Sequence, residues 1–208
     1  MYRPIHKDWY YSYVDIPNIE VIRKELIDLV QNDIAGYRTN PTAYNIDSKT
    51  VMENCSELKQ YLKKFGIDRS FHRLLVTKKI NDDADKVVHV DAYNPKYLQK
   101  SLNLGLINYE GSYLSWHETD IKHLHDSAQF GLDPEKNFAF IEIEKTKEVC
   151  RLEYGNRATI VNTTVLHKGN AQKSNRIIGG LRFVPELNEQ DLINMGVINP
   201  YKQIEKQE

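Results

Sequence analysis

The stretch Arg176-Ile-Ile-Gly-Gly-Leu-Arg-Phe183 decides the fold, because it reads as one long strand with two unlike faces. Side chains alternate across a strand. One face carries Arg176, Ile178, Gly180 and Arg182. The other carries Ile177, Gly179, Leu181 and Phe183, which predicts packing against helices. Guanidinium groups on an interior face need an anionic partner, which is either a bound carboxylate or a protein carboxylate.

Further strand-like segments precede this stretch. They are rich in β-branched and aromatic residues, are separated by turn residues, and cover 71–80, 86–91, 101–109, 112–118, 137–144, 157–162 and 165–168. We predict a hairpin between 101–109 and 112–118 around Glu110-Gly111. A second predicted hairpin places His167 opposite Arg176. Short strands at close spacing are typical of a β-sandwich or barrel.

Helical patterns flank the strands. The first predicted helix opens at Pro17-Asn18, ends near Asn32, and has an apolar stripe of Val21, Ile22, Leu26, Leu29 and Val30. The second runs from about Lys49 to Phe65, is capped by Asp47 or Ser48, and is stopped by Gly66. A short third helix covers 189–195. We expect a single domain over 1–208, with a helical part at 1–68, a β core at 69–185 and a helical tail at 186–208.

Composition narrows the classes of function. The 208 residues carry a net charge of −1, which makes a nucleic-acid substrate unlikely. No apolar run is long enough for a membrane span, and the first residues lack the apolar core of a signal peptide. The two cysteines do not form a disulfide framework, so a reducing cytoplasm is expected. The sequence carries no signal for an oligomeric state.

His89-Val90-Asp91 and the distant His167 form the strongest chemical pattern. His89 and Asp91 point to the same side of a strand, so both can bind one metal ion. Two histidines and one carboxylate are the ligand set of the facial triad that binds non-haem Fe(II) and leaves positions open for a co-substrate and dioxygen. Arg176 follows His167 closely and could hold a carboxylate of that co-substrate.

Two other clusters compete with this pattern. His6-Lys7-Asp8 has the same spacing, but it precedes any regular element and is interpreted as surface. The run His117-Glu118, Asp120, His123 and His125-Asp126 contains a His-x-His pair that could bind a metal if extended. Because this run leads into a long loop, the alternative interpretation is a polar rim near a pocket.

At this point the motifs resemble a known family. They are His89-x-Asp91, the segment from Ser101 to Trp116, Asn162-Thr-Thr-Val-Leu-His167, and Asn175-Arg-Ile-Ile-Gly-Gly-Leu-Arg-Phe183. Over roughly residues 70 to 184 the chain resembles the Fe(II)/2-oxoglutarate-dependent dioxygenases. It looks most similar to prolyl and aspartyl/asparaginyl hydroxylase-like proteins, including uncharacterised phage and marine bacterial members. The resemblance implies a mainly β, cupin-like double-stranded β-helix (jelly roll), with N-terminal helices packed on its major sheet.

The resemblance also implies roles for individual residues. His89, Asp91 and His167 would be the iron ligands, and no further catalytic residue is implied. Arg176 would hold the distal carboxylate of 2-oxoglutarate. Co-substrate contacts are expected from Asn108 and Arg182, although Arg182 could equally hold a substrate carboxylate or a structural partner. Pocket positions are expected at Trp116, Asn103 and Tyr109, with core packing as the alternative for Trp116.

The expected activity is hydroxylation of an amino acid, a protein side chain or a small metabolite. It would be coupled to conversion of 2-oxoglutarate and dioxygen to succinate and carbon dioxide, with ascorbate as a candidate reductant. The expected setting is the cytoplasm of a bacterium or of a phage-infected host cell. Two alternatives stay open, a jelly-roll protein that binds a ligand without turnover and a cupin-type metal enzyme that does not use 2-oxoglutarate.

Overall fold

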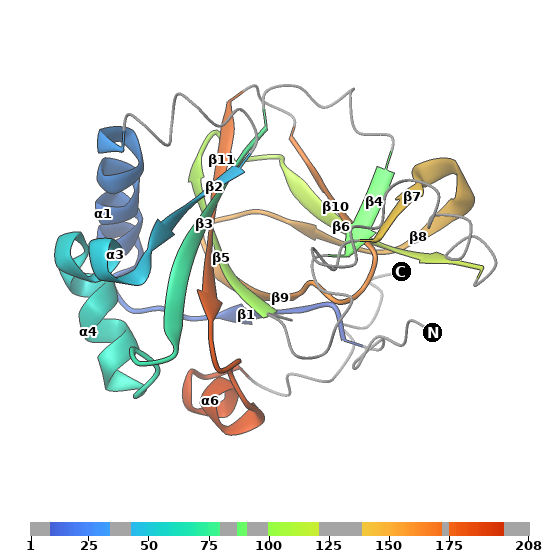
Figure 1. Ribbon diagram of the computed structural model, residues 1–208. Coiled ribbons are helices and arrows are strands. Elements are labelled where there is room, and N and C mark those ends of the chain that lie inside the picture. Colours follow the sequence, from blue (N-terminus) through green and yellow to red (C-terminus); the bar gives the residue numbers. More distant parts are fainter. Residues whose placement is uncertain are drawn as a thin grey trace.

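The computed structural model describes residues 9–33, 43–79, 87–90, 100–120, 139–171 and 175–197. Within these residues the strands form two antiparallel sheets (Figure 1). The six-stranded sheet has the order β1 (Tyr11–Val14), β9 (Ala158–Asn162), β5 (Lys100–Ile107), β11 (Arg176–Phe183), β3 (Phe71–Lys79) and β2 (Ala43–Asp47). The five-stranded sheet has the order β7 (Ala139–Glu142), β4 (Val87–Val90), β10 (His167–Asn170), β6 (Tyr113–Thr119) and β8 (Thr146–Glu153). The prediction of a mainly β protein is confirmed.

The chain crosses between the two sheets repeatedly. The strands β3, β4, β5 and β6 alternate between the sheets, and so do β9, β10 and β11. This order is consistent with the expected jelly roll. It brings residues of β4, β10 and β11, which lie far apart in the sequence, to the space between the sheets.

Both predicted hairpins are wrong, because β5 and β6 lie in different sheets, as do β10 and β11. The turn after β5 does form: Asn108 and Gly111 have positive φ, and the Ser112 amide donates to the Tyr109 carbonyl at 2.9 Å. The flanking strands nevertheless bury their apolar side chains in different layers. Leu102 of β5 packs on the helix side, whereas Trp116 of β6 packs between the sheets. Turn chemistry therefore predicted the bend but not the pairing.

The helices lie beside the outer face of the six-stranded sheet (Figure 1). Among the described residues they are α1 (Ile19–Asn32), α3 (Ser48–Asn54), α4 (Ser56–Lys64) and α6 (Glu189–Asn194). One apolar cluster joins Leu26 of α1 and Leu62 of α4 to Leu74 of β3 and Leu181 of β11. Val21 does not take part, because its side chain is 49% exposed, so its place in the predicted apolar stripe is wrong. No helix within the described residues has the length and apolar character that crossing a membrane requires.

The predicted second helix is broken into α3 and α4 at Cys55. The break is stabilised by Glu25 of α1, whose carboxylate accepts from the Ser56 hydroxyl at 2.8 Å and from the Glu57 amide at 3.1 Å. A carboxylate from another helix therefore caps the N-terminus of α4. The predicted ends are confirmed: Asp47 accepts from the Thr50 amide at 2.9 Å, and Gly66 follows α4 with a φ of 68°.

Three strands, β1, β2 and β8, were not predicted. In β8, which lies at the edge of its sheet, most side chains are exposed or half-buried. Such a strand lacks the apolar alternation from which strands are recognised. The 3-10 turn Ile143–Lys145 connects it to β7.

Candidate functional site

His89 and His167 lie side by side on neighbouring strands. They are direct register partners in the β4–β10 pair, and their ring centroids are 4.5 Å apart. His167 is also the register partner of Trp116, which packs in the apolar cluster between the two sheets, so both histidines belong to the interior face. The two halves of the predicted ligand set are therefore brought together by the fold. Asp91, the third predicted ligand, lies outside the described residues.

The ring of His167 is oriented by the backbone. Its Nδ1 atom lies 2.9 Å from the Val165 carbonyl oxygen, and the side chain is 5% exposed. Because a carbonyl oxygen can only accept, Nδ1 carries a hydrogen, and in the neutral ring Nε2 keeps its lone pair. This is the arrangement by which proteins hold a metal-binding histidine. The two imidazoles therefore fit a divalent metal such as Fe(II). The described residues alone contain no group of three His, Cys, Asp or Glu side chains that could hold a metal.

Arg176 approaches the histidine-bearing strand from the opposite sheet. The residue is 5% exposed, and Nη1 donates to the Asn170 carbonyl at 3.2 Å. A Cβ on Gly169 would lie 3.4 Å from both Nη1 and Nη2, so the guanidinium lies against the bare backbone of Gly169. Arg176 thus reaches the strand of His167 across the space between the two sheets rather than across a hairpin. The guanidinium reaches the strand two to three residues beyond His167.

The predicted alternation of β11 is confirmed by its packing. Ile178 belongs to the cluster between the sheets. Ile177, Leu181 and Phe183 belong to the cluster on the helix side. Arg176, which has the parity of Ile178, therefore lies on the interior face.

Lys79 is a buried cation beside Arg176 that the sequence analysis did not single out. It is the register partner of Arg176, it is 9% exposed, and Nζ donates to the Gly169 carbonyl at 2.5 Å. A lysine at a strand end is usually solvated, so its residue type and position do not indicate a buried site. The signal was alternation: Leu74 and Val76 pack on the helix side, which puts Lys79 on the interior face.

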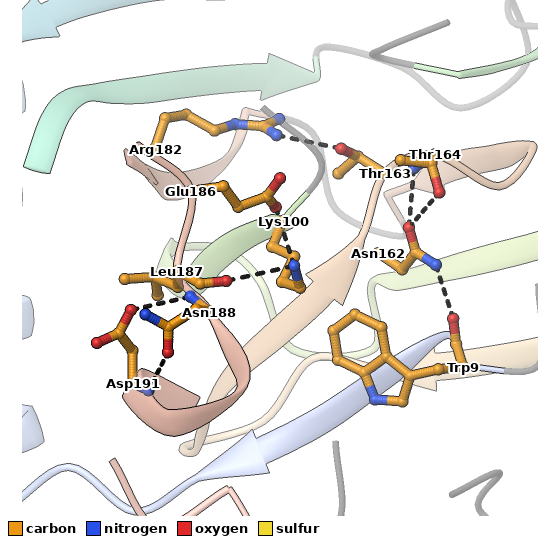
Figure 2. A network of polar contacts seen from close by, with 10 residues as sticks. All are labelled: Trp9, Lys100, Asn162, Thr163, Thr164, Arg182, Glu186, Leu187, Asn188 and Asp191. Atoms are coloured by element: carbon orange, nitrogen blue, oxygen red, sulfur yellow. Dashed lines mark hydrogen bonds and ion pairs between the residues drawn. The ribbon is translucent and has the colours of Figure 1, made fainter. Parts of the chain in front are cut away.

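Arg182 lies at the other end of β11 and is 6% exposed. Its Nη1 donates to the Thr163 hydroxyl at 3.4 Å, as Figure 2 shows. Its register partner on β3 is Arg73. The segment 163–170 therefore meets Arg182 at its start and Arg176 near its end, with His167 between them.

Trp116 and Asn103 both lie inside the barrel. Trp116 is fully buried, its Nε1 donates to the Asn162 carbonyl at 2.9 Å, and its ring stacks on Tyr11 with centroids 5.5 Å apart. Asn103 accepts from the Ser101 hydroxyl at 2.5 Å and donates to the Tyr154 hydroxyl at 3.2 Å. Trp116 thus has the contacts of a core residue, and Asn103 belongs to an interior polar group.

Asn108 and Tyr109 form part of the turn after β5. Asn108 is exposed, and its φ of 49° serves the bend. The Tyr109 ring lies below the Arg23 guanidinium, 5.2 Å from it, and its hydroxyl donates to Asn156 at 2.8 Å. The contacts of Tyr109 therefore secure the turn and α1, and the backbone of Asn108 forms the bend.

His117 is a buried residue of β6. Its Nε2 lies 3.0 Å from the Ser115 hydroxyl, and its Nδ1 lies 3.0 Å from the Thr146 hydroxyl. Burial lowers the pKa of His117, and the nearby Glu148 carboxylate opposes that shift. Both ring nitrogens are thus engaged by hydroxyls, which indicates a structural role. The residues His123, His125, Asp126, His6 and Asp8 lie outside the described part of the chain.

Comparison with known proteins gives similarity at the level of structure only. No family model matches the sequence, and no curated protein matches it. A prolyl-4-hydroxylase from Pseudomonas putida has a TM-score of 0.47 and 13% identity, covering 86% of this chain and 93% of that chain. The non-heme alpha ketoglutarate dependent carbocyclase SnoK from nogalamycin biosynthesis has a TM-score of 0.46 and 10% identity, covering 85% of this chain and 80% of that chain.

A third structure is HygX from Streptomyces hygroscopicus with nickel and 2-oxoglutarate bound. Its TM-score is 0.43 and its identity 10%, covering 85% of this chain and 82% of that chain.

Proposed function

We propose that this protein is an Fe(II)- and 2-oxoglutarate-dependent oxygenase that hydroxylates an amino acid, a protein side chain or a small metabolite. The observation that carries the proposal is the adjacency of His89 and His167 on the interior face, with Arg176 reaching the same strand from the opposite sheet. The two imidazoles fit a metal ion, and the guanidinium of Arg176 fits a carboxylate. Cytoplasmic localisation remains part of the proposal.

His89, Asp91 and His167 would hold the iron. When bound, Fe(II) supplies the dioxygen-dependent oxidation of 2-oxoglutarate to succinate and carbon dioxide that is coupled to substrate hydroxylation. The Val165 carbonyl fixes the tautomer and the ring orientation of His167. Ascorbate is the proposed reductant for iron that becomes oxidised.

Arg176 would bind the distal carboxylate of 2-oxoglutarate with its planar pair of donors. Gly169 leaves room for this orientation, since a Cβ there would lie in van der Waals contact with the guanidinium, 3.4 Å from Nη1 and Nη2. The buried rings of Trp116 and Tyr11 exclude water from the neighbouring interior. A dry site strengthens the attraction between the cation and the carboxylate.

Arg182 is assigned to a carboxylate of the substrate. It contacts the chain at Thr163, before His167, whereas Arg176 contacts it at Asn170, after His167. The variant Arg182→Met should therefore leave the affinity for 2-oxoglutarate within about twofold of wild type. A loss of affinity as large as that caused by Arg176→Met would instead assign Arg182 to the co-substrate.

An anaerobic titration tests the proposed function. Fe(II) and 2-oxoglutarate together should give a weak visible charge-transfer band in the wild-type protein, and the band should be absent in His167→Ala. A band that persists in His167→Ala would remove His167 from the metal site. A wild-type protein that binds Fe(II) but gives no band, and that forms no succinate once dioxygen is admitted, would favour the cupin-type alternative.

A further inference from the structure

We propose that Lys79 is a second cation for the distal carboxylate of 2-oxoglutarate, and that the Lys79–Arg176 pair restricts the co-substrate to dianionic 2-oxo acids. This inference rests on the proposed function and assigns a further residue to the same site. The pair comes from two neighbouring strands of the six-stranded sheet. Both side chains leave that sheet on its interior face.

Backbone register places the two cations together. Lys79 and Arg176 are direct partners at the end of the β3–β11 ladder, and directly opposed residues in antiparallel strands have Cα atoms about 4.5–5.5 Å apart. Lys79 is 9% exposed and Arg176 is 5% exposed. Two positive groups are therefore buried side by side, which is unusual for lysine and arginine.

The two side chains converge on one point of the opposite sheet. Lys79 Nζ donates to the Gly169 carbonyl at 2.5 Å, and Arg176 Nη1 donates to the Asn170 carbonyl at 3.2 Å. Gly169 is also the residue against whose backbone the guanidinium lies. Both cationic groups thus contact β10 at Gly169 and Asn170, which follow His167 on that strand.

The charges of Lys79 and Arg176 indicate the kind of ligand group that this position would bind. Two buried like charges repel each other, and an anion held between them relieves that repulsion. A carboxylate has two oxygens with about four acceptor sites, so it can accept from a guanidinium and from an ammonium together. Arg176 supplies a planar fork and Lys79 a compact point charge. A 2-oxo acid with a neutral tail leaves both cations without this ligand and should bind far more weakly.

Lys78 provides a matched control on the same strand. Its register partner is Ile177, which packs in the cluster on the helix side. Lys78→Met therefore removes the same charge, one residue away, from the opposite face. If net charge alone mattered, Lys78→Met and Lys79→Met would both weaken the binding of 2-oxoglutarate. If Lys79 binds the carboxylate, only Lys79→Met would weaken it.

The experiment is an anaerobic titration of the Fe(II)-loaded protein with two probes, 2-oxoglutarate and 2-oxopentanoate, which lacks the distal carboxylate. Lys79→Met should weaken 2-oxoglutarate binding roughly tenfold or more, as expected for a hydrogen bond to a charged group. It should leave 2-oxopentanoate binding within about twofold, and Lys78→Met should leave both within about twofold. Lys79→Arg, which keeps the charge, should recover part of the lost affinity.

The outcomes separate the two proposals. If wild type binds 2-oxoglutarate and Lys79→Met binds it equally well, the role of Lys79 is overturned while the oxygenase proposal stands. An equal loss for both probes would show a structural role for Lys79 and would also overturn the inference. If wild type gives no signal with 2-oxoglutarate, the proposed function itself fails. Thermal unfolding of Lys79→Met, compared with Lys79→Arg, verifies that each variant is folded.

Discussion

The two faces of the six-stranded sheet differ although the same strands form both. On the helix side, Leu74, Leu102 and Leu181 are fully buried in one apolar cluster. On the interior side, alternate residues of these strands include Lys79, Asn103 and Arg176. Apolar burial stabilises the fold, whereas buried cations stabilise it only when they are paired. We infer that the helix-side face mainly stabilises the domain, whereas the interior face provides the residues of the candidate functional site.

Leu181→Ala tests the stabilising face and should have the largest effect. Leu181 is fully buried, so the truncation leaves a cavity and should lower the free energy of unfolding by about 2–5 kcal/mol. Urea denaturation measures this loss. The affinity of the folded protein for 2-oxoglutarate should not change, and a loss of affinity with intact stability would contradict the division between the faces.

Gly180→Ala tests the neighbouring position on the interior face. A Cβ at Gly180 would lie 2.7 Å from the Ser101 hydroxyl and 3.0 Å from Asn103 Oδ1. We expect a loss of about 1–3 kcal/mol from overpacking, measured by the same denaturation. Ser101→Ala, combined with Gly180→Ala, should recover part of it. No recovery would show that the crowding lies elsewhere.

His117 gives a pH-dependent comparison within the five-stranded sheet. Its pKa is lowered in the folded protein, so the unfolded chain binds a proton more readily. The stabilising contribution of neutral His117 is present above pH 6.5 and is lost as the pH falls through its lowered pKa. The stability difference between wild type and His117→Asn should therefore shrink from pH 7.5 to lower values. Denaturation at several pH values checks this, and a constant difference would contradict it.

Val21→Ala should have the smallest effect. Val21 lies on α1 but is 49% exposed, away from the apolar cluster. Its truncation should change the free energy of unfolding by about 0.5 kcal/mol or less. A larger loss in urea denaturation would show that the outer surface of α1 packs against another part of the protein.

The sequence predicted local features better than it predicted which strands pair and which helices contact each other. The alternation of β11, the cap at Asp47 and the stop at Gly66 follow from single residues and their neighbours, and all three are confirmed. The pairing of β5 with β6 was wrong, because strand partners depend on which layer buries each face. The break at Cys55 was not visible either, since it depends on Glu25 from another helix.

For the candidate site, motif spacing predicted His89, His167 and Arg176. In the fold the two histidines are register partners, and Arg176 contacts the strand of His167 at Asn170. The proposed role of Lys79 could not be predicted from sequence, because it depends on its register partner Arg176 and on Gly169 of the opposite sheet. The cluster that begins at His117 was ambiguous in sequence. In the fold, two hydroxyls occupy both nitrogens of His117.

The measurement that tests the central claim most directly is a paired titration of Arg176→Met under anaerobic conditions, first with Fe(II) and then with 2-oxoglutarate. If Arg176 serves the co-substrate, the affinity for Fe(II) stays within about twofold of wild type. The affinity for 2-oxoglutarate should then fall by about 2 kcal/mol, as for a lost hydrogen bond to a charged group. Equal loss of both affinities would show that Arg176 is structural and would contradict the account.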